Sequence, residues 1–313
     1  MNAKLQKQNN VQYRYYELPP NLPVLALLGN RWIRPYGSDM PNSHFHNLME
    51  IGYCYDGSGV MVYDELRIPY GEGLISIIPP NFLHNTIAEL GTTSRWEYLF
   101  FDAESFLIDM YGPLSQDAMQ LLRRSYAATW HLQMDDYREL GQIILSIFDL
   151  CRRKDEFYEL EVKCLLMALI VRIARLTPEE IKTHKGPVEN NTLVQKALHF
   201  VQSNYERHIQ IADIAHACHV SETHCRRLFA KSIHMNPIAY INLVRVTAAC
   251  RLLRNSHESI RAIAAKCGFS SLSTFNRNFF EHVGIPPHQW RKGILDHGKQ
   301  LEKKSILLFN GWL

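Results

Sequence analysis

The chain has 313 residues, of which 46% are hydrophobic and 21% charged, and its formal net charge is +3. This composition excludes a disordered chain, and the length predicts two domains rather than one. No run approaches the ~20 consecutive apolar residues of a membrane-spanning helix, and the N-terminus lacks the apolar core of a secretory signal. We therefore expect a cytoplasmic protein without a membrane partner.

Charge is unevenly distributed along the chain. Residues 191–297 contain 13 Lys and Arg against 6 Asp and Glu, which gives +7, whereas the rest of the chain carries −4. This asymmetry predicts a polyanionic partner for the C-terminal part alone. The seven cysteines form no C-x-x-C pair and lie mostly among apolar residues, which indicates reduced, buried thiols.

Residues 24–101 are predicted to form short strands. Segments rich in Val, Ile, Tyr and Phe alternate with the turn sequences DGSG at 56–59, PYGEG at 69–73 and PPN at 79–81. Strands at this spacing indicate a small barrel or sandwich, to which we assign residues 1–110.

A polar motif lies within these strands. His44, His46 and Glu50 fall within seven residues. Positions 44 and 46 share one face of a strand, and a regular strand would place Glu50 on the same face. Imidazoles combined with a carboxylate suit Zn, Fe, Mn or Ni, so the motif predicts either a metal site or the remains of one.

The hydrophobic period changes to that of helices after Asp102. Helices are predicted at 114–126, 134–153 and 157–176. The last one is apolar nearly all round between Cys164 and Val171, so it must be covered either by its own barrel or by a second subunit. We assign 111–176 to a helical dimerisation segment and the Pro- and Gly-containing residues 177–190 to a linker. The tail, 298–313, has no structural prediction.

The C-terminal segment contains a repeat with a period of 49–50 residues. IADIAHACHVSETHCRRLF at 211–229 aligns with IRAIAAKCGFSSLSTFNRNFF at 260–280, and the second copy has one extra residue. Each copy is predicted to be a helix, a tight turn and a second helix. Gly268 suits a turn position with positive φ, whereas His219 stands there in the first copy and predicts a slightly strained turn.

The second helix of each copy has an apolar face and a polar face. Its inward residues are predicted to be Cys225, Phe229, Phe275 and Phe279. We expect Ser221 and Ser270 to be the N-caps. The polar faces carry side chains of the types that contact bases and phosphates in a major groove. DNA contacts are predicted for Glu222, Thr223, His224, Arg226, Arg227, Ser271, Ser273, Asn276 and Arg277.

One helix of about 18 residues, beginning at Pro237, is predicted between the copies. At ~1.5 Å per residue it is about 27 Å long. A rod of this length can hold two recognition helices roughly one duplex turn apart on one side of DNA.

Residues 191–295 resemble the DNA-binding domain of the AraC family of bacterial transcription regulators. They follow the pattern I-x-x-I-A-x-x-x-G-F, F-x-R-x-F and G-x-x-P-x-x-x-R at Ile260, Ile263, Ala264, Gly268, Phe269, Phe275, Arg277, Phe279, Gly284, Pro287 and Arg291. The resemblance implies a sequence-specific regulator that binds a double-stranded DNA operator and a small-molecule effector, forms a homodimer, and contacts RNA polymerase if it activates transcription. It also implies base reading by Thr223, Arg226 and Arg227.

The N-terminal strands are similar to the cupin-type barrel that many members of this family carry. Gly37-x6-His44-x-His46-x3-Glu50-x6-Gly57 resembles the first cupin motif, and Gly73-x5-Pro79-x-Asn81-x2-His84 resembles the second. This implies His44, His46, Glu50 and His84 as ligands where a divalent metal is bound, although Asn81 and Ala88 depart from the second motif. The same interior often binds a sugar in the family. Predicted effector contacts are therefore Trp32, His44, His46, Glu50, Tyr53, His84 and Trp96.

Three interpretations of the barrel interior stay open: an effector pocket that requires no cofactor, an effector pocket with a bound metal, and purely structural histidines. The expected fold class is multidomain α+β, with a cupin-like barrel and dimerisation helices before an all-α domain that holds two helix-turn-helix motifs. The competing functions are a metal-dependent cupin enzyme fused to a nucleic-acid-binding domain, and a non-specific nucleic-acid or scaffold protein.

Overall fold

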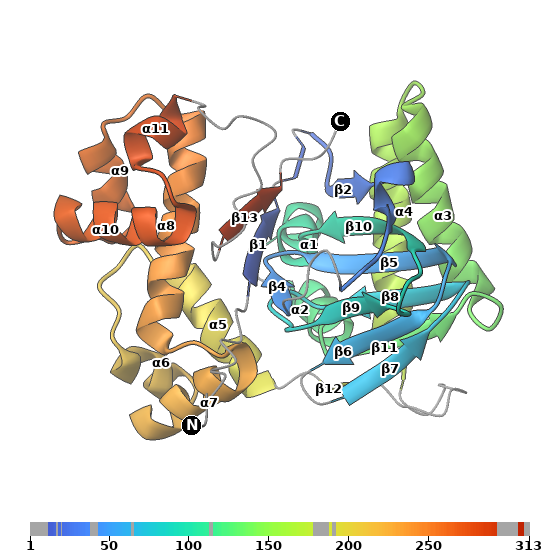
Figure 1. Cartoon of the computed structure of the whole chain (residues 1–313), viewed down its shortest axis with the longest axis horizontal. Coiled ribbons are helices and arrows are strands. Elements are labelled where there is room, and N and C mark those ends of the chain that lie inside the picture. Colours follow the sequence, from blue (N-terminus) through green and yellow to red (C-terminus); the bar gives the residue numbers. More distant parts are fainter. Residues whose placement is uncertain are drawn as a thin grey trace. The chain divides into compact units, whose positions relative to one another are not determined.

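The computed structural model describes residues 12–16, 18–19, 21–37, 43–63, 66–112, 115–177, 188–189, 192–292 and 306–309. They fall into two compact units, one made mainly of residues 14–190 and the other mainly of residues 191–307 (Figure 1). These are called the N-terminal and the C-terminal unit below. Most of the predicted linker, residues 178–187, lies outside the described residues.

The first part of the chain is rich in strands. These are β1 (Gln12–Tyr16), β2 (Val24–Leu27), β3 (Ile33–Arg34), β4 (His44–His46), β5 (Met49–Asp56), β6 (Gly59–Tyr63), β7 (Leu66–Tyr70), β8 (Leu74–Ile78), β9 (Asn85–Ala88), β10 (Ser94–Phe101), β11 (Ala128–Gln133) and β12 (Val188–Glu189). The main sheet has the order β12-β11-β8-β5-β10-β2, with β3 also paired to β10, and the small sheet has the order β7-β6-β9. Neighbouring strands within both sheets run antiparallel.

Two apolar cores lie on opposite faces of the main sheet, because successive residues of a strand point to opposite sides. On β5, Met49 and Ile51 belong to the core shared with the helices, whereas Cys54 belongs to the core between the two sheets. A slip of one residue would exchange Ile51 with Glu50. Since burying an aliphatic side chain contributes roughly 1.5–3 kcal/mol, this register is strongly fixed, and it directs Glu50 to the interior.

Four helices cover the other face of the main sheet: α1 (Ala103–Tyr111), α2 (Gln116–Ser125), α3 (Arg138–Arg153) and α4 (Tyr158–Ala174). Side chains cap the first two helices, since Asp102 accepts a hydrogen bond from the Ser105 backbone and Ser115 accepts one from the Ala118 backbone. The barrel covers only part of α4. Phe157, just before the helix, and Leu160 within it are 71% and 61% exposed.

Several elements of this unit were not predicted. They are β1, β7, β11, β12, α1 and the 3-10 turn η1 (Asn30–Trp32). The end of β7 had been assigned to a turn, although Ile68 and Tyr70 alternate with exposed residues as a half-buried strand does. The segment predicted to be helical, 111–176, also contains β11, which pairs with β8 in the main sheet.

The C-terminal unit is helical. Its helices are α5 (Thr192–Asn204), α6 (Ile211–Ala217), α7 (Glu222–Ile233), α8 (Pro237–Asn255), α9 (Ile260–Lys266), α10 (Leu272–Val283) and α11 (Pro287–Arg291), and β13 (Ile306–Phe309) follows in the tail. The prediction of a long helix between the repeats is confirmed, because α8 has 19 residues and begins at Pro237. It contacts both α7 and α10 (Figure 1).

The turns of the two repeats match their prediction. Gly268 has φ 80° and His219 has φ 56°, so both residues are left-handed. One N-cap prediction was wrong: α10 is capped by Ser271 and not by Ser270, because the extra residue of the second copy shifts the helix start. Ser221 caps α7 as predicted.

The seven cysteines are free thiols. Five of them are buried as predicted, whereas Cys164 is exposed and Cys151 is half-buried. Within the described residues, no helix is both long enough and apolar enough to span a membrane.

Candidate functional site

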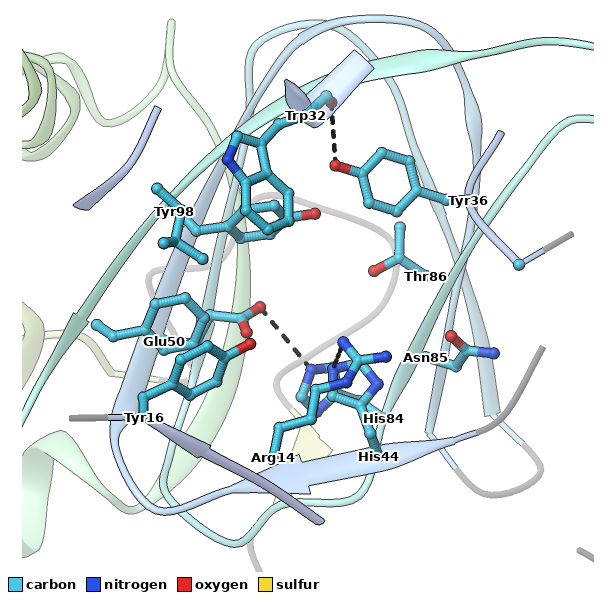
Figure 2. A pocket seen from close by; sticks show the side chains of 13 residues that line it. Arg14, Tyr16, Trp32, Tyr36, His44, Glu50, His84, Asn85, Thr86 and Tyr98 are labelled. Atoms are coloured by element: carbon cyan, nitrogen blue, oxygen red, sulfur yellow. Dashed lines mark hydrogen bonds and ion pairs between the residues drawn. The ribbon is translucent and has the colours of Figure 1, made fainter. Parts of the chain in front are cut away.

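A pocket lies in the interior of the N-terminal unit (Figure 2). It is lined by Arg14, Tyr16, Leu27, Trp32, Tyr36, Gly37, His44, Glu50, His84, Asn85, Thr86, Tyr98 and Phe100. Its volume is about 40 Å³. Since one water needs roughly 10–15 Å³ on this measure, the pocket has room for about three waters.

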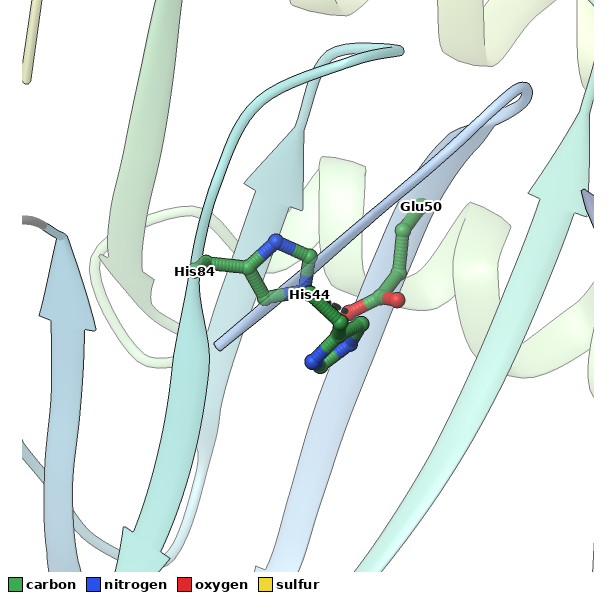
Figure 3. A group of neighbouring side chains, drawn as sticks. All are labelled: His44, Glu50 and His84. Atoms are coloured by element: carbon green, nitrogen blue, oxygen red, sulfur yellow. Dashed lines mark ion pairs between the residues drawn. The ribbon is translucent and has the colours of Figure 1, made fainter. Parts of the chain in front are cut away.

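One end of the pocket is polar. Potential ligand atoms of His44, Glu50 and His84 lie within 4.8 Å of one another, and all three residues are buried (Figure 3). The backbones of His44 and His84 exchange two hydrogen bonds, of 2.8 and 2.9 Å, which sets their rings side by side at 4.2 Å between centroids. The strand arrangement therefore fixes this cluster.

Glu50 reaches the histidines from a different strand. A bend at residues 47–48 separates β4 from β5, so the condition of one regular strand from His44 to Glu50 is not met. The carboxylate lies 3.1 Å from Nε2 of His46 and 3.8 Å from Nε2 of His84. His46 thus contacts Glu50 but does not line the pocket.

The donor set of this cluster fits a divalent metal. His84 places Nδ1 2.9 Å from the carbonyl oxygen of Phe82 and turns Nε2 toward Glu50. His46 uses Nδ1 in the same way, 2.7 Å from the carbonyl oxygen of Leu48. Metal-ligating histidines commonly donate their second N–H to a backbone carbonyl in this manner, and imidazole with carboxylate suits Zn, Fe, Mn or Ni.

A positive side chain also enters this end. Nη1 of Arg14, from β1, lies 2.9 Å from Nε2 of His44, and the Arg14 residue is only 8% exposed (Figure 2). The strand that carries it is held by Asn47, whose Oδ1 accepts from the Tyr16 backbone N–H at 2.8 Å and whose Nδ2 donates to the Tyr16 carbonyl at 3.0 Å. Arg14 is therefore held in a fixed position within the site.

Burial and the neighbouring charges set the protonation of the cluster. Burial, together with the Arg14 charge, holds the pKa of His44 well below its usual value. Burial lowers the pKa of His84 to about 4. Burial disfavours the charged form of Glu50, but a hydrogen bond with His46 and the nearby His84 and Arg14 outweigh it, so the pKa of this carboxyl is lowered. At neutral pH the pocket presents neutral His44 and His84 beside an ionised Glu50.

The other end of the pocket is aromatic. Trp32, from η1, meets the ring of Tyr98, from β10, edge to face at 5.5 Å between centroids. The Tyr36 hydroxyl donates to the Trp32 carbonyl at 3.0 Å and holds this wall together (Figure 2). A ring-shaped polar ligand could pack on these faces while it hydrogen-bonds at the opposite end.

The structure brings together part of the predicted effector set. Trp32, His44, Glu50 and His84 line the pocket, but His46, Tyr53 and Trp96 do not. Tyr53 packs against the helix-side core, on the face of β5 opposite Glu50. Trp96 is fully buried and stacks on Tyr98 at 6.0 Å between ring centroids, but it does not line the pocket itself. The prediction overlooked Arg14, Tyr16, Leu27, Tyr36, Gly37, Asn85, Thr86, Tyr98 and Phe100.

In the C-terminal unit, the predicted inward residues Cys225, Phe229, Phe275 and Phe279 are all buried. The outward side chains predicted to contact DNA are exposed at Glu222, Thr223, Arg226, Arg227, Ser271, Ser273, Asn276 and Arg277, whereas His224 is half-buried. Three of these, Glu222, Arg226 and Ser271, make contacts within the chain. Arg226 lies 3.4 Å from Glu222, and Oγ of Ser271 accepts from the Thr274 backbone as an N-cap.

Arg245 of α8 connects the two helix-turn-helix motifs. Its Nε donates to the Tyr205 carbonyl at 2.9 Å and its Nη2 donates to the Arg207 carbonyl at 2.8 Å, next to the first motif. Its guanidinium also lies 5.7 Å from the ring of Phe269, in the turn of the second motif. The residue is 9% exposed. One buried side chain thus ties both motifs to the same helix.

Each of the two units matches a family model built from known proteins. A family model for an AraC-like ligand binding domain matches residues 34–170, and a model for a helix-turn-helix domain matches residues 214–293. The melibiose operon regulatory protein of Escherichia coli K12 is 24% identical over 259 residues, which cover 81% of this chain and 84% of that protein.

Two further relatives are also regulators. The transcriptional activator RhaS of Klebsiella pneumoniae is 23% identical over 252 residues, 80% of this chain and 87% of that protein. The lactose operon transcription activator of Staphylococcus xylosus is 28% identical over 110 residues, 35% of this chain and 39% of that protein. The similarity to RhaS spans both units, whereas the similarity to the lactose operon activator is confined to about a third of the chain.

Proposed function

Because the chain belongs to the AraC family of transcription regulators, we propose that its N-terminal pocket binds a sugar effector and that α7 and α10 read an operator as part of a homodimer. The chain is a DNA-binding regulator and not an enzyme, since its relatives across both units are regulators. In this proposal the regulator acts in the bacterial cytoplasm, and it contacts RNA polymerase if it activates transcription.

The composition of the pocket carries the effector proposal. The aromatic rings of Trp32 and Tyr98 line the same pocket as the hydrogen-bonding groups of Glu50, Asn85 and Thr86 (Figure 2). Sugars offer both an apolar ring face and several hydroxyls, so this pairing suits them. Two relatives are named for the melibiose and lactose operons, which supports a sugar as the ligand class. No cofactor is required for such binding.

The small size of the pocket limits which ligands can enter it without a change in the wall. A volume of about 40 Å³ is too small for any sugar, a monosaccharide included, so sugar binding has to move part of the wall. A ligand that favours one arrangement of the wall over another shifts the population toward it, and this difference in affinity is what makes the unit a switch.

The exposed faces of α7 and α10 support the DNA proposal. We assign base contacts to Thr223, Arg226 and Arg227, with Ser273, Asn276 and Arg277 serving the second groove. The ion pair between Arg226 and Glu222 is about half exposed. Such a surface pair contributes only about 0–1 kcal/mol, so Arg226 can exchange it for a base or phosphate.

The homodimer proposal rests on α4 and the residue before it. Phe157, Leu160 and Cys164 are exposed and follow one another at helical spacing, although α4 buries its opposite side. An exposed apolar stripe of this kind marks an interaction surface. We propose that a second copy of the chain covers it.

A thermal-shift screen of the full chain tests the effector proposal. Melibiose, lactose, galactose, glucose and arabinose are added singly, and a sugar at 100 times its Kd should stabilise the folded unit by about 2.7 kcal/mol. Trp32→Ala should abolish the shift. Tyr53→Phe, on the opposite face of the sheet, should keep it. If no sugar raises the melting temperature, the proposed ligand class is wrong.

A further inference from the structure

The polar end of the pocket has the donor set of a metal centre, yet it already holds a cation from the chain itself. We propose that the Arg14 guanidinium occupies the place of a divalent metal among His44, Glu50 and His84, and that it keeps metal out of the wild-type protein. This inference does not depend on the identity of the effector or on DNA binding.

The bonding of His44 is the first step. A guanidinium has only donors and stays protonated in proteins, so Nε2 of His44 accepts the 2.9 Å hydrogen bond from Arg14. A neutral imidazole has one acceptor nitrogen, and the other nitrogen carries the proton. Arg14 therefore uses the lone pair that His44 would offer to a metal, whichever of its nitrogens faces the cluster.

The charge of Glu50 is the second step. The residue is 4% exposed and sits on the interior face of the main sheet. A buried carboxylate is costly unless a positive group accompanies it. Arg14 is buried beside the same cluster and supplies a permanent positive charge, as a metal ion would. A divalent ion in addition would face like-charge repulsion at short range.

The anchoring of β1 is the third step, because it shows that Arg14 is held in place. Tyr16 exchanges two hydrogen bonds with the Asn47 side chain. Its ring stacks on Phe100 at 4.0 Å between centroids and 25° between planes, and meets His46 edge to face at 5.9 Å. Two positions before Tyr16, Arg14 points to the same face of the strand. To vacate the cluster, Arg14 must change its side-chain conformation or β1 must detach.

Metal binding by Arg14 variants tests the proposal. Full-length wild type, Arg14→Gln and Arg14→Ala, freed of affinity tags, are dialysed against Co²⁺ and, separately, Zn²⁺. Bound metal is measured by elemental analysis, and Co²⁺ also by its visible absorption. Arg67→Ala removes an exposed arginine of β7 and is the matched control. Thermal unfolding establishes which variants are folded.

Wild type and Arg67→Ala should hold far less than one metal per chain, whereas Arg14→Gln and Arg14→Ala should approach one. A hydrogen bond to a charged group contributes roughly 1.5–3 kcal/mol, so the Kd for Co²⁺ should fall at least about tenfold in the Arg14 variants. Adding His84→Ala to Arg14→Gln should remove the gained site.

Two results would overturn the proposal. One is stoichiometric metal in the wild-type protein that Arg67→Ala also holds, and this result needs no folded Arg14 variant. The other is a folded Arg14→Gln chain that binds no more metal than wild type.

Discussion

Gly268→Ala is a direct test of how tightly the second helix-turn-helix is built. Gly268 has φ 80°, and an added Cβ would lie 2.3 Å from the Tyr205 carbonyl oxygen and 2.9 Å from Nε of Arg245. The nearest atom belongs to the backbone, and Arg245 is itself held by two hydrogen bonds. Neither neighbour can move without disturbing the connection between the motifs.

The expected loss of stability has two parts. A left-handed backbone costs a residue with a Cβ roughly 1–2 kcal/mol, and overpacking typically costs about 1–3 kcal/mol. We therefore expect about 3 kcal/mol. For a unit of ~100 residues this corresponds to a fall in melting temperature of roughly 15 °C. The reverse substitution can be made in the first motif, where His219 is left-handed. His219→Gly relieves backbone strain but adds conformational entropy to the unfolded chain, so the free energy of unfolding should hardly change.

The assay is differential scanning calorimetry of the full chain. Gly268→Ala should lower the transition of the C-terminal unit and leave that of the N-terminal unit unchanged, which provides an internal control. A loss below about 1 kcal/mol would refute the reasoning, because the left-handed strain alone costs that much.

Three other changes have defined outcomes. Arg227→Ala should lose about 1–3 kcal/mol of discrimination at one base pair, measured by competition binding at fixed salt; equal weakening on all sequences would instead identify a phosphate contact. Leu160→Glu should convert dimers to monomers in light scattering, and an unchanged mass would remove α4 from the interface. Burial lowers the pKa of His131 to about 4, so the unfolded state binds more protons below pH 6.5. Stability should therefore fall by up to about 3 kcal/mol between pH 6.5 and 4. His131→Gln should flatten this fall in calorimetric titrations, and an identical pH profile would contradict it.

The C-terminal unit could be predicted well because its signals are local. A left-handed turn, a proline at the helix start and a serine cap each act within a few residues, so Gly268, Pro237 and Ser221 are readable from the sequence. The error at Ser270 came from the extra residue in the second copy, which leaves two adjacent serines as equivalent candidates. The structure shows Ser271 as the cap, since its side chain accepts a hydrogen bond from the Thr274 backbone N–H.

The pocket was harder because strand pairing decides its lining. Tyr53 and Glu50 are three residues apart on one strand and therefore face opposite sides. Arg14 lies in a short strand 30 residues before His44, and nothing in the local sequence joins the two. The tyrosine-rich run QYRYY at 12–16 was the signal that could have revealed that strand, although not its partner.

Arg245 has a consequence for the operator. A regulator whose two helix-turn-helix motifs are flexibly connected can bind sites with variable spacing. Here the buried guanidinium of Arg245 links the residues beside both motifs to one helix, α8. If α7 and α10 contact DNA as proposed, the protein sets the operator spacing: about five base pairs inserted between the two contacted grooves would rotate one of them to the far side of the duplex, roughly half a helical turn away. Promoters under this regulator should accordingly share one invariant distance between their paired contacts, whatever the intervening bases.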